Sequence, residues 1–248
     1  MNWPQKGALL SLLLAILALL LLAIAPLGWR AGWWHYRFAF SWLMTSSGIL
    51  ALAAAISAIV AIVLGWSGLD QTAGALAVVA MLLGAFLAYV PWQYNRTRNT
   101  VPRIHDITTD TENPPQFAAV LPARAAEHAA SSNYEGRELA RQQKAAYPDM
   151  EPLMLSLAAG EAFQRALEVA RAMPGWTIVG SDPGTGRIEA SQASRWFRFI
   201  DDIVIRVSPI DSGSRVDMRS LSRQGRSDFG VNATRIRSYM SALKKRLA

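Results

Sequence analysis

Two kinds of hydrophobic pattern divide the chain. Up to Val90 the sequence contains three long apolar segments, at about 8–26, 40–64 and 73–90, and none of them contains Asp, Glu, Lys or Arg. Each segment is long enough to cross the hydrocarbon core of a bilayer as a helix. The sequence therefore predicts a region of three transmembrane helices over residues 1–92.

The charged residues that flank these segments predict their orientation. Arg30 and Arg37 follow the first segment, and Arg96, Arg98 and Arg103 follow the third. Because cytoplasmic loops are enriched in Lys and Arg, we expect the region after the third segment to lie in the cytoplasm. The absence of ionisable residues inside the segments argues against a transporter or a channel.

Beyond the third segment, the strongest pattern is an alternation of apolar and polar residues between positions 197 and 207. Apart from Asp201, one face of this stretch is apolar, and the other face carries most of the polar side chains. The apolar residues are Phe197, Phe199, Ile203, Ile205 and Val207. A period of two residues is typical of a half-buried strand, so the sequence predicts a strand here.

A second strand is expected after residues 209–214, which have the composition of a turn. In one register of the two strands, Arg206 lies opposite Asp217 and Ile205 lies opposite Met218. Charge then faces charge and apolar side chains face one another, as stable cross-strand pairs require. We therefore predict an antiparallel hairpin at the centre of a soluble domain.

Further elements complete this domain. We expect an amphipathic helix over residues 157–173, a hairpin over 176–191 and a C-terminal helix with apolar residues at gaps of three or four. The predicted fold class is α+β, with a four-stranded antiparallel sheet packed by two helices over residues 157–248. Residues 93–156 are expected to form an extended or irregular linker and wrap.

Charge and cysteine content narrow the classes of function. The chain has 25 Lys and Arg against 18 Asp and Glu, and twelve of the basic but five of the acidic residues lie from Arg195 onward. This local excess predicts contact with an anion; an Arg-rich surface without a ligand is the alternative. The absence of cysteine excludes disulfides, thiolate metal sites and a Cys nucleophile.

The expected partners follow from these features. Besides the membrane, they are an anionic small molecule or lipid headgroup, or another protein. Nucleic acid is not expected, because the basic residues lack interleaved exposed aromatic residues and because a three-helix anchor suits a ligand at the membrane surface better. No cofactor is expected, since the sequence contains no dinucleotide fingerprint, phosphate loop, zinc helix or nucleophile elbow.

One candidate ligand-binding surface lies between the last predicted strand and the C-terminal helix. It consists of Arg219, Arg223, Arg226, Ser227 and Asp228. Guanidinium groups and the free backbone N–H groups of a helix start can hold an anion. The alternative is that these arginines pair locally with Asp202, Asp217 and Asp228.

A second set of candidates consists of His105, Asp106, Asp110 and Asp201. Imidazole and carboxylate groups are plausible metal ligands, although Thr and Asp before a turn also satisfy backbone donors without any metal. Asp201 shares the apolar face of its strand with Ile203. A buried carboxylate needs a partner, so we expect an Arg or a helix N-terminus beside it, or else a site.

Five ordered motifs resemble those of a known family. They are Ile104-His105-Asp106-Ile107-Thr108-Thr109-Asp110, Ala146-Tyr147-Pro148-Asp149, Gly186-Arg187-Ile188-Glu189-Ala190, Phe197-Arg198-Phe199-Ile200-Asp201-Asp202, and Ser220-Leu221-Ser222-Arg223-Gln224-Gly225-Arg226-Ser227-Asp228. Over residues 101–247 the chain resembles the bacterial family of the domain of unknown function 1499. The resemblance implies no activity, and together with the three predicted helices it implies a multi-pass protein of the bacterial plasma (inner) membrane.

Two functions follow as hypotheses. The favoured one is a membrane-tethered, non-catalytic binding or assembly module that presents an Arg-rich surface to an anionic ligand, lipid headgroup or partner protein. The alternative is a membrane-anchored metal-assisted or hydrolytic enzyme that uses His105, Asp106 and Asp110. Convergence of His105 with Asp201 or Arg223 would favour the enzyme, and burial of these groups in mutual pairs would favour the module.

Overall fold

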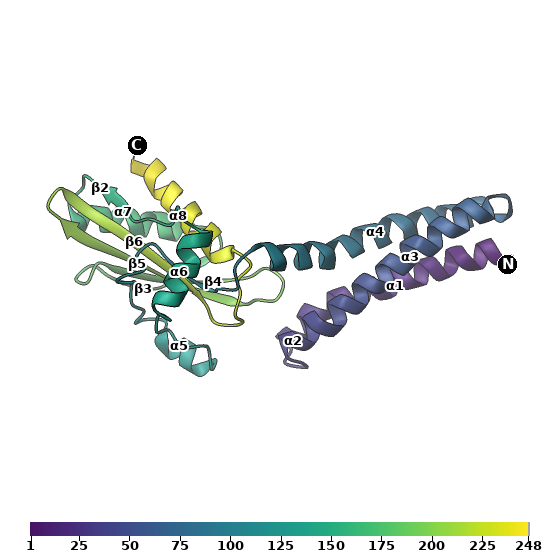
Figure 1. The fold of residues 1–248 in the computed structure, drawn as a ribbon, viewed down its shortest axis with the longest axis horizontal. Coiled ribbons are helices and arrows are strands. Elements are labelled where there is room, and N and C mark those ends of the chain that lie inside the picture. Colours follow the sequence, from purple (N-terminus) through teal and green to yellow (C-terminus); the bar gives the residue numbers. More distant parts are fainter. Residues whose placement is uncertain (248) are drawn as a thin grey trace. The chain divides into compact units, whose positions relative to one another are not determined.

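The computed structural model describes residues 1–247 and divides the chain into two compact units, Met1–Asn99 and Thr100–Ala248 (Figure 1). The first unit is entirely helical. Its elements are α1 (Trp3–Arg30), α2 (Tyr36–Phe38), the π-helix η1 (Ala39–Met44), α3 (Thr45–Gly65), the 3₁₀-helix η2 (Trp66–Gly68) and α4 (Gln71–Thr100).

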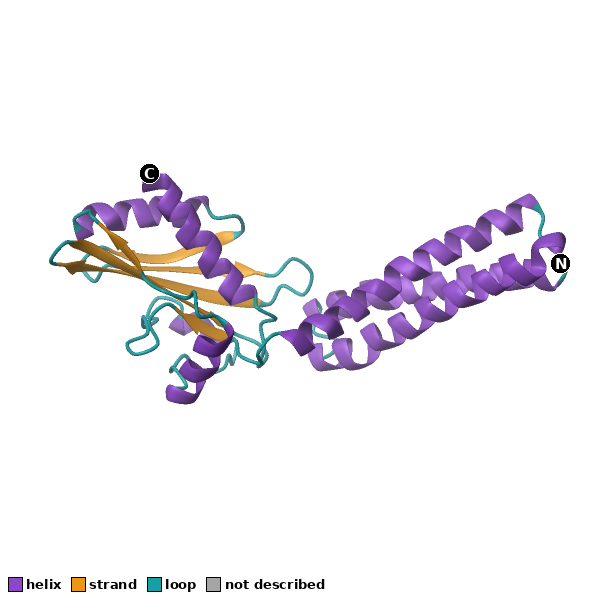
Figure 2. Cartoon of the chain, turned by 45° about the horizontal axis from the view of Figure 1, so that its top comes forward, coloured by secondary structure: helices purple, strands orange, loops and turns teal. Residues whose placement is uncertain are grey.

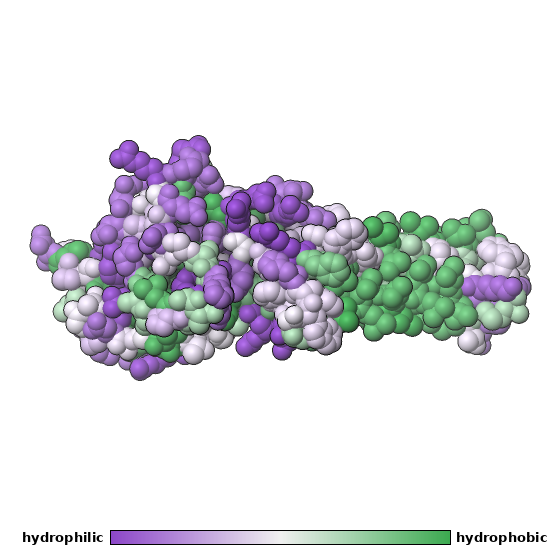
Figure 3. All heavy atoms as spheres, turned by 90° about the horizontal axis from the view of Figure 1, so that it is seen from below, coloured by the Kyte–Doolittle hydropathy of each residue, from purple (hydrophilic) through white to green (hydrophobic). Residues whose placement is uncertain are grey.

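Three stretches of this unit are long and apolar enough to cross a membrane. They are Trp3–Arg30, Tyr36–Gly68 and Gln71–Thr100, and they contain the three segments predicted from the sequence. Most of the surface that they present in Figure 3 is hydrophobic. The polar residues of the second unit contrast with this apolar surface in the same view.

Small residues hold these helices together. A Cβ atom on Gly84 would lie 2.6 Å from the Ala51 carbonyl oxygen and 2.9 Å from the Ala55 nitrogen, so α3 and α4 are in backbone contact there. Ser47 is buried and its hydroxyl donates to the Ala18 carbonyl of α1 at 2.7 Å. Close approach at Gly and Ala with a few hydroxyl bonds is typical of helices in lipid.

Two prolines lie inside helices, where the sequence pattern had predicted the ends of the apolar segments. Pro26 lies within α1, which ends at Arg30, and Pro91 lies within α4, which continues to Thr100. A proline removes one backbone bond and needs space on the side of the preceding turn. Gly48 of α3 also leaves room for the Pro91 ring between the two helices, because a Cβ at Gly48 would lie 2.7 Å from that ring.

The second unit is a sheet with helices (Figure 2). Its strands are β1 (Asp106–Thr108), β2 (Leu153–Leu155), β3 (Trp176–Asp182), β4 (Arg187–Ala193), β5 (Ile200–Ile210) and β6 (Gly213–Ser222). Its helices are α5 (Leu121–Ala126), α6 (Arg137–Ala146), α7 (Ala159–Ala172) and α8 (Val231–Leu247).

The described sheet has six antiparallel strands in the order β1-β6-β5-β4-β3, with β2 also paired to β6. The α+β class predicted from the sequence is confirmed, but the predicted number of four strands is wrong. The two additional strands, β1 and β2, each contain three residues and come from the segment expected as linker and wrap. Three residues are too few to show an alternation, so only pairing with β6 reveals them.

The central hairpin has the predicted register. Arg206 lies opposite Asp217 and Ile205 lies opposite Met218 in the β5–β6 pair. The predicted start of β5 at Phe197 is wrong, because the strand begins at Ile200. Residues 194–199 instead form a loop in which the Arg198 N–H donates to the Ser194 carbonyl at 3.1 Å.

The two faces of the sheet are covered by different parts of the chain. On one face, α7 and α8 enclose an apolar core that includes Ile188, Ile203, Ile205 and Met218. The Tyr239 hydroxyl of α8 donates to the Ala166 carbonyl of α7 at 2.9 Å, which joins the two helices over this core. The opposite face is covered by residues 109–134, called here the covering segment, which includes α5.

Candidate functional site

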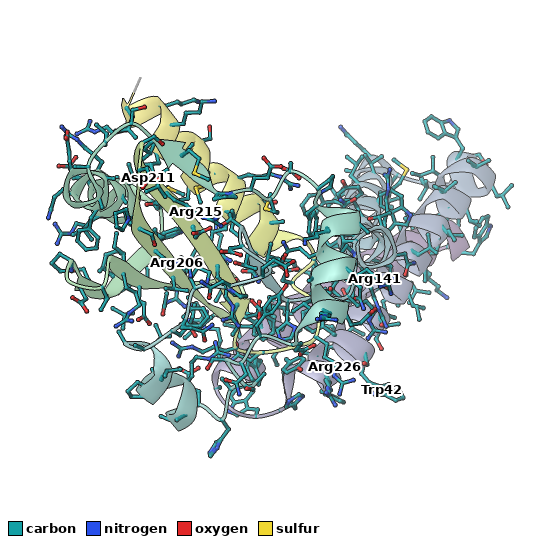
Figure 4. All side chains as sticks on the ribbon, turned by 60° about the vertical axis from the view of Figure 1, so that its left-hand side comes forward. Trp42, Arg141, Arg206, Asp211, Arg215 and Arg226 are labelled. Carbon is teal, nitrogen blue, oxygen red and sulfur yellow. The ribbon has the colours of Figure 1, made fainter. Side chains whose placement is uncertain are left out.

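The face beneath the covering segment is rich in charge. Alternate residues of β4, β5 and β6 point toward it, because side chains of a strand alternate between the two faces of a sheet. The charged residues on this face are Arg187, Glu189, Asp202, Arg206, Arg215, Asp217 and Arg219. Figure 4 labels Arg206 and Arg215, which lie on the neighbouring strands β5 and β6.

Arg219 is fully buried on this face and is bound in a bidentate manner by Asp106 of β1. Its Nε donates to Oδ1 at 2.9 Å and its Nη2 donates to Oδ2 at 2.8 Å. Its remaining contacts are with the Pro115 and Ser132 carbonyls and with the rings of Phe117 and Tyr134. Four hydrogen bonds and two ring faces surround this fully buried guanidinium, so it is not available to an external ligand.

Asp202 holds two arginines at once. It accepts from Nη1 of Arg124 at 2.7 Å and from Nε and Nη2 of Arg223 at 2.8 Å each. The Ser191 hydroxyl donates to the same carboxylate at 2.7 Å, and Glu127 accepts from Arg223 at 2.6 Å. Hydrogen bonding to Asp202 raises the pKa of Arg223 above its usual value, so Arg223 is a permanent structural cation.

Asp110 and Asp217 share a second pair of arginines. Nη2 of Arg206 donates to Asp110 at 3.0 Å and to Asp217 at 2.9 Å, and Arg215 binds the same two carboxylates at 2.9 Å. Burial by itself raises the pKa of Asp110, but the backbone N–H of Asn113 and the two guanidinium groups lower it below its ordinary value. Asp110 is therefore an ionised pairing group and not a proton donor.

The side chain of Glu189 on β4 binds the backbone of the covering segment. Its carboxylate is 1% exposed and accepts from the N–H groups of Ala118 and Ala119 at 2.9 Å and of Val120 at 3.0 Å. Gly180 of β3 leaves the space for this contact, because a Cβ there would lie 2.7 Å from that of Ala119. The covering segment is thus bonded to the sheet at its start, middle and end.

A smaller polar cluster surrounds Asp201 on the helix side of the sheet. Arg235 of α8 donates to Asp201 at 2.6 Å, to Ser220 at 2.9 Å and to Gln192 at 2.7 Å. Arg235 also bonds Asn232 of α8. Of the two partners expected for Asp201, an arginine or a helix N-terminus, the structure has an arginine, Arg235 of the C-terminal helix.

The N-terminus of α8 is capped by Asp228, which precedes the helix. Asp228 accepts from the N–H groups of Gly230 at 2.9 Å and of Asn232 at 2.7 Å. Burial raises the pKa of Asp228 above its usual value, although these two backbone donors oppose the shift. Because Asp228 occupies the free N–H groups, the helix start does not offer them to an external anion.

The predicted anion surface is therefore divided between two environments. Arg219 and Arg223 lie in buried ion pairs, Asp228 is a helix cap, and Ser227 is half-buried beside it. Arg226 is exposed and forms no ion pair with any described residue. Of this set, only Arg226 is a cation with room for a ligand.

The residues of the enzyme hypothesis do not form a common centre. His105 and Asp201 flank β6 at Ser222, since the Ser222 N–H donates to the His105 carbonyl and Asp201 pairs with Ser222 on the other side. Two strand spacings put their backbones roughly 10 Å apart. Asp106 and Asp110 are bound by arginines, and no three His, Asp or Glu residues in the described chain are grouped to hold a metal.

Two cavities lie outside the charged face. One, of about 570 Å³, lies in the second unit between β2, α7 and the C-terminal end of α8, and the other, of about 260 Å³, is in the helical unit. The first is lined by Met154, Leu155, Ser156, Leu157, Glu161, Arg165, Arg246 and Leu247. The second is lined by Phe40, Ser41, Met44, Thr45, Pro91, Tyr94, Asn95 and Arg98. Neither contains a residue that the sequence analysis singled out as a ligand-binding candidate.

Sequence reasoning missed several members of these networks. Arg187 and Glu189 alternate along a short strand and could have been assigned to the charged face from that pattern. Arg124 lies in an Ala-rich stretch without periodicity, and Arg235 lies among several arginines of an amphipathic helix. Neither residue carries a local signal of its partner, because the partners lie 78 and 34 residues away.

Comparison with known proteins gives one family. A family model described as "Protein of unknown function (DUF1499)" matches residues 106–243, which include every strand of the sheet and most of α8. No curated protein matches the chain.

Proposed function

The chain belongs to the DUF1499 family, and we propose that it is a membrane-anchored, non-catalytic module that binds a partner through exposed surface. The three apolar helices of the first unit supply the anchor. The second unit supplies a rigid platform, since its sheet is enclosed by helices on one face and by the covering segment on the other. Its ligand is anionic, a class to which a lipid headgroup or an acidic partner protein belongs.

One observation carries this proposal: the buried carboxylates of the charged face are already paired with arginines. Asp106, Asp202 and Asp217 are at most 3% exposed, and each accepts from at least one guanidinium. A general base or metal ligand needs a free lone pair that faces substrate. These carboxylates are buried and face arginines of their own domain instead of a substrate, so they support the module rather than the enzyme.

We further propose that the anchor lies in a bacterial plasma membrane with the second unit in the cytoplasm. The helical unit carries Arg30, Arg37, Arg96 and Arg98 around one set of helix ends, and Lys6 and Asp70 around the other. Cytoplasmic loops carry the excess of arginine and lysine. This distribution supports the orientation.

Native mass spectrometry with metal analysis tests the non-catalytic assignment. We expect the full-length protein, extracted gently in detergent, to retain lipid or protein and no stoichiometric metal. A metal that is lost in Asp110→Asn but kept in Asp149→Asn would overturn the proposal. Asp149 is a suitable control because it pairs with Arg237 on the exposed surface.

Cysteine labelling tests the orientation. The chain has no cysteine, so Asp211→Cys creates a single labelling site at the exposed tip of the β5–β6 hairpin. We expect a membrane-impermeant maleimide to label this variant in inverted membrane vesicles but not in intact spheroplasts. Labelling in spheroplasts would place the second unit on the outer side.

A further inference from the structure

The loop between β4 and β5 is a rigid turn that presents an aromatic side chain. The Ser194 N–H donates to the Phe199 carbonyl at 2.7 Å, and the Phe199 N–H donates to the Ser194 hydroxyl at 2.9 Å. Arg198 has a φ of 58°, a conformation that residues with a Cβ rarely adopt. Three bonds across six residues, including that from Arg198 to Ser194, hold the loop in one shape.

The side chains of this loop do not serve the core of the domain. Trp196 is 71% exposed, and Arg195 and Arg198 on either side of it are exposed and pair with no carboxylate among the described residues. The half-buried rings of Phe197 and Phe199 stack with centroids 5.2 Å apart and support the turn. This arrangement corrects the expectation that the basic residues lack an interleaved exposed aromatic residue.

Two other segments join the loop at the same end of the sheet. The Arg223 N–H donates to the Ile200 carbonyl at 2.9 Å, so the segment that carries Arg226 runs beside the start of β5. The chain also enters the unit here, because the Ile104 carbonyl accepts from the Asp228 N–H at 3.2 Å. Arg103, which precedes Ile104, is exposed and unpaired in the described chain.

These residues define the basic end of the second unit: Arg103, Arg195, Trp196, Arg198 and Arg226. The carboxylates around it are already occupied. Asp201 is bound by Arg235, Asp228 caps α8, and Glu127 is bound by Arg223. Four arginines around an exposed indole therefore have no neutralising partner within the described chain.

Among anionic surfaces, a phospholipid membrane fits the basic end best. An indole prefers the boundary between headgroups and acyl chains, and arginines beside it contact lipid phosphates. The membrane in question is the one that the protein's own helices would cross. Only residues 101–103 separate Ile104 from α4, which is part of a candidate span. A short tether keeps the local lipid concentration high, so a small contact surface suffices.

We propose that the basic end docks on the anionic lipid surface of the membrane in which the protein is anchored. Trp196 enters the headgroup region, and the four arginines contact lipid phosphates. This inference rests on the proposed function and identifies its anionic ligand as phospholipid. Docking holds the sheet in a defined orientation to the bilayer, with the β5–β6 hairpin directed away from it.

A single-cysteine probe tests this docking in the full-length protein. Trp196→Cys, labelled with the environment-sensitive dye NBD, is reconstituted into nanodiscs of phosphatidylcholine with or without phosphatidylglycerol. We expect blue-shifted emission and several-fold weaker iodide quenching in the anionic nanodiscs. The same label at Asp211→Cys, at the opposite end of β5 (Figure 4), is the control and is expected to stay solvent-exposed.

Equal behaviour of the two labels in anionic nanodiscs would overturn the inference. Protection that is the same with neutral and anionic lipid would overturn the part assigned to phosphates, and protection that requires added protein or nucleic acid would replace the membrane by that partner. Near-UV circular dichroism establishes that the labelled protein is folded. If the Trp196→Cys variant does not fold, Arg195→Cys provides a second labelling position in the same loop.

Charge variants test the arginines separately. Arg195→Gln with Arg226→Gln is expected to reverse most of the blue shift at position 196. Lys244→Gln with Lys245→Gln removes the same charge from exposed positions at the C-terminal end of α8 and is expected to leave the shift unchanged. Equal effects of the two double variants would show that only net charge matters. Lipid retained in mass spectra without any protection of the probe would refute this docking and leave the proposed function intact.

Discussion

On the helix side of the sheet, Ile203, Ile205 and Met218 are fully buried against α7 and α8, whereas on the other side Asp202, Asp217 and Arg219 are just as fully buried. The same two strands, β5 and β6, thus bury apolar side chains on one face and charged side chains on the other. Apolar contacts are non-directional and depend on the area removed from water. Buried ion pairs are directional, and each leaves an uncompensated charge if one partner is lost.

This difference explains how the covering segment is held. Its described residues contribute Phe117 and Val120 to a small apolar cluster with Val204 and Leu221, and the segment also makes the ion pairs and hydrogen bonds described above. A segment with so little apolar surface cannot bury itself by the hydrophobic effect alone. Charge-assisted hydrogen bonds to the sheet occur along the whole segment, and they hold it in one conformation.

The largest effect is expected from breaking the Arg219–Asp106 pair on one side only. Arg219→Met leaves the Asp106 carboxylate buried without a partner and is expected to destabilise the second unit by about 3–5 kcal/mol. The double variant Asp106→Leu with Arg219→Met removes both charges and is expected to recover most of that loss. Urea titration of the detergent-solubilised chain, followed by near-UV circular dichroism, measures both. A double variant as unstable as the single one would contradict this account.

Truncating a side chain on the apolar face is expected to lower the free energy of unfolding by a similar or smaller amount. The cause is lost packing instead of an unpaired charge. Ile205→Ala removes buried methyl and methylene groups and is expected to cost about 3 kcal/mol. Ile205→Leu keeps the volume and is expected to cost less than about 1.5 kcal/mol. The matched swap on the charged face, Arg219→Lys, keeps charge but loses the bidentate fork, so it is expected to cost more than Ile205→Leu. The same urea titration compares them, and the reverse order would show that the two faces tolerate change alike.

Acid is expected to affect the charged face through Asp110. Because the folded-state pKa of Asp110 lies below its ordinary value, its stabilisation is present above about pH 4 and is lost as pH falls through the folded pKa. Asp110→Asn is expected to cost about 1 kcal/mol at pH 7 and to flatten the pH dependence below about pH 4. Urea midpoints measured from pH 7 downward test this. Asp211→Asn, at an exposed hairpin tip without an ion pair, is the control and is expected to leave the profile unchanged.

The smallest effect is expected at the start of α8. Asp228→Ala removes the cap and is expected to cost about 1 kcal/mol. Asp228→Asn keeps only one of the two oxygens that accept from the Gly230 and Asn232 N–H groups, and it removes a carboxylate whose pKa is raised by burial. A raised carboxyl pKa means that the folded state favours the protonated form, so the charge opposes folding at neutral pH. The Asn variant keeps one cap bond and loses the unfavourable charge, so it is expected to lose less thermal stability at pH 7 than the Ala variant, and a loss as large as that of the Ala variant would contradict this.

Several features of the fold could be predicted because they are local. The three apolar segments, the amphipathic helices and the register of the central hairpin each follow from patterns within about 25 residues. The neighbour of Asp201 followed from the cost of burying a lone carboxylate, although its identity as Arg235 did not. The predicted start of β5 at Phe197 was wrong because Phe197 and Phe199 continue the alternation in the sequence. In the structure, hydrogen bonds to Ser194 turn the chain at these residues.

The sequence by itself determined the three long apolar helices, the α+β class and the central pairing of β5 with β6, since periodicity and turn chemistry act between near neighbours. Only the tertiary structure decided which charges are free. Arg219 meets Asp106 across 113 residues, and Arg124 meets Asp202 across 78, whereas Arg195, Arg198 and Arg226 meet no carboxylate within the described chain. Ion pairing depends on distance and burial in space. The same residue type therefore serves as an internal tie on β6 and as an exposed cation at the basic end.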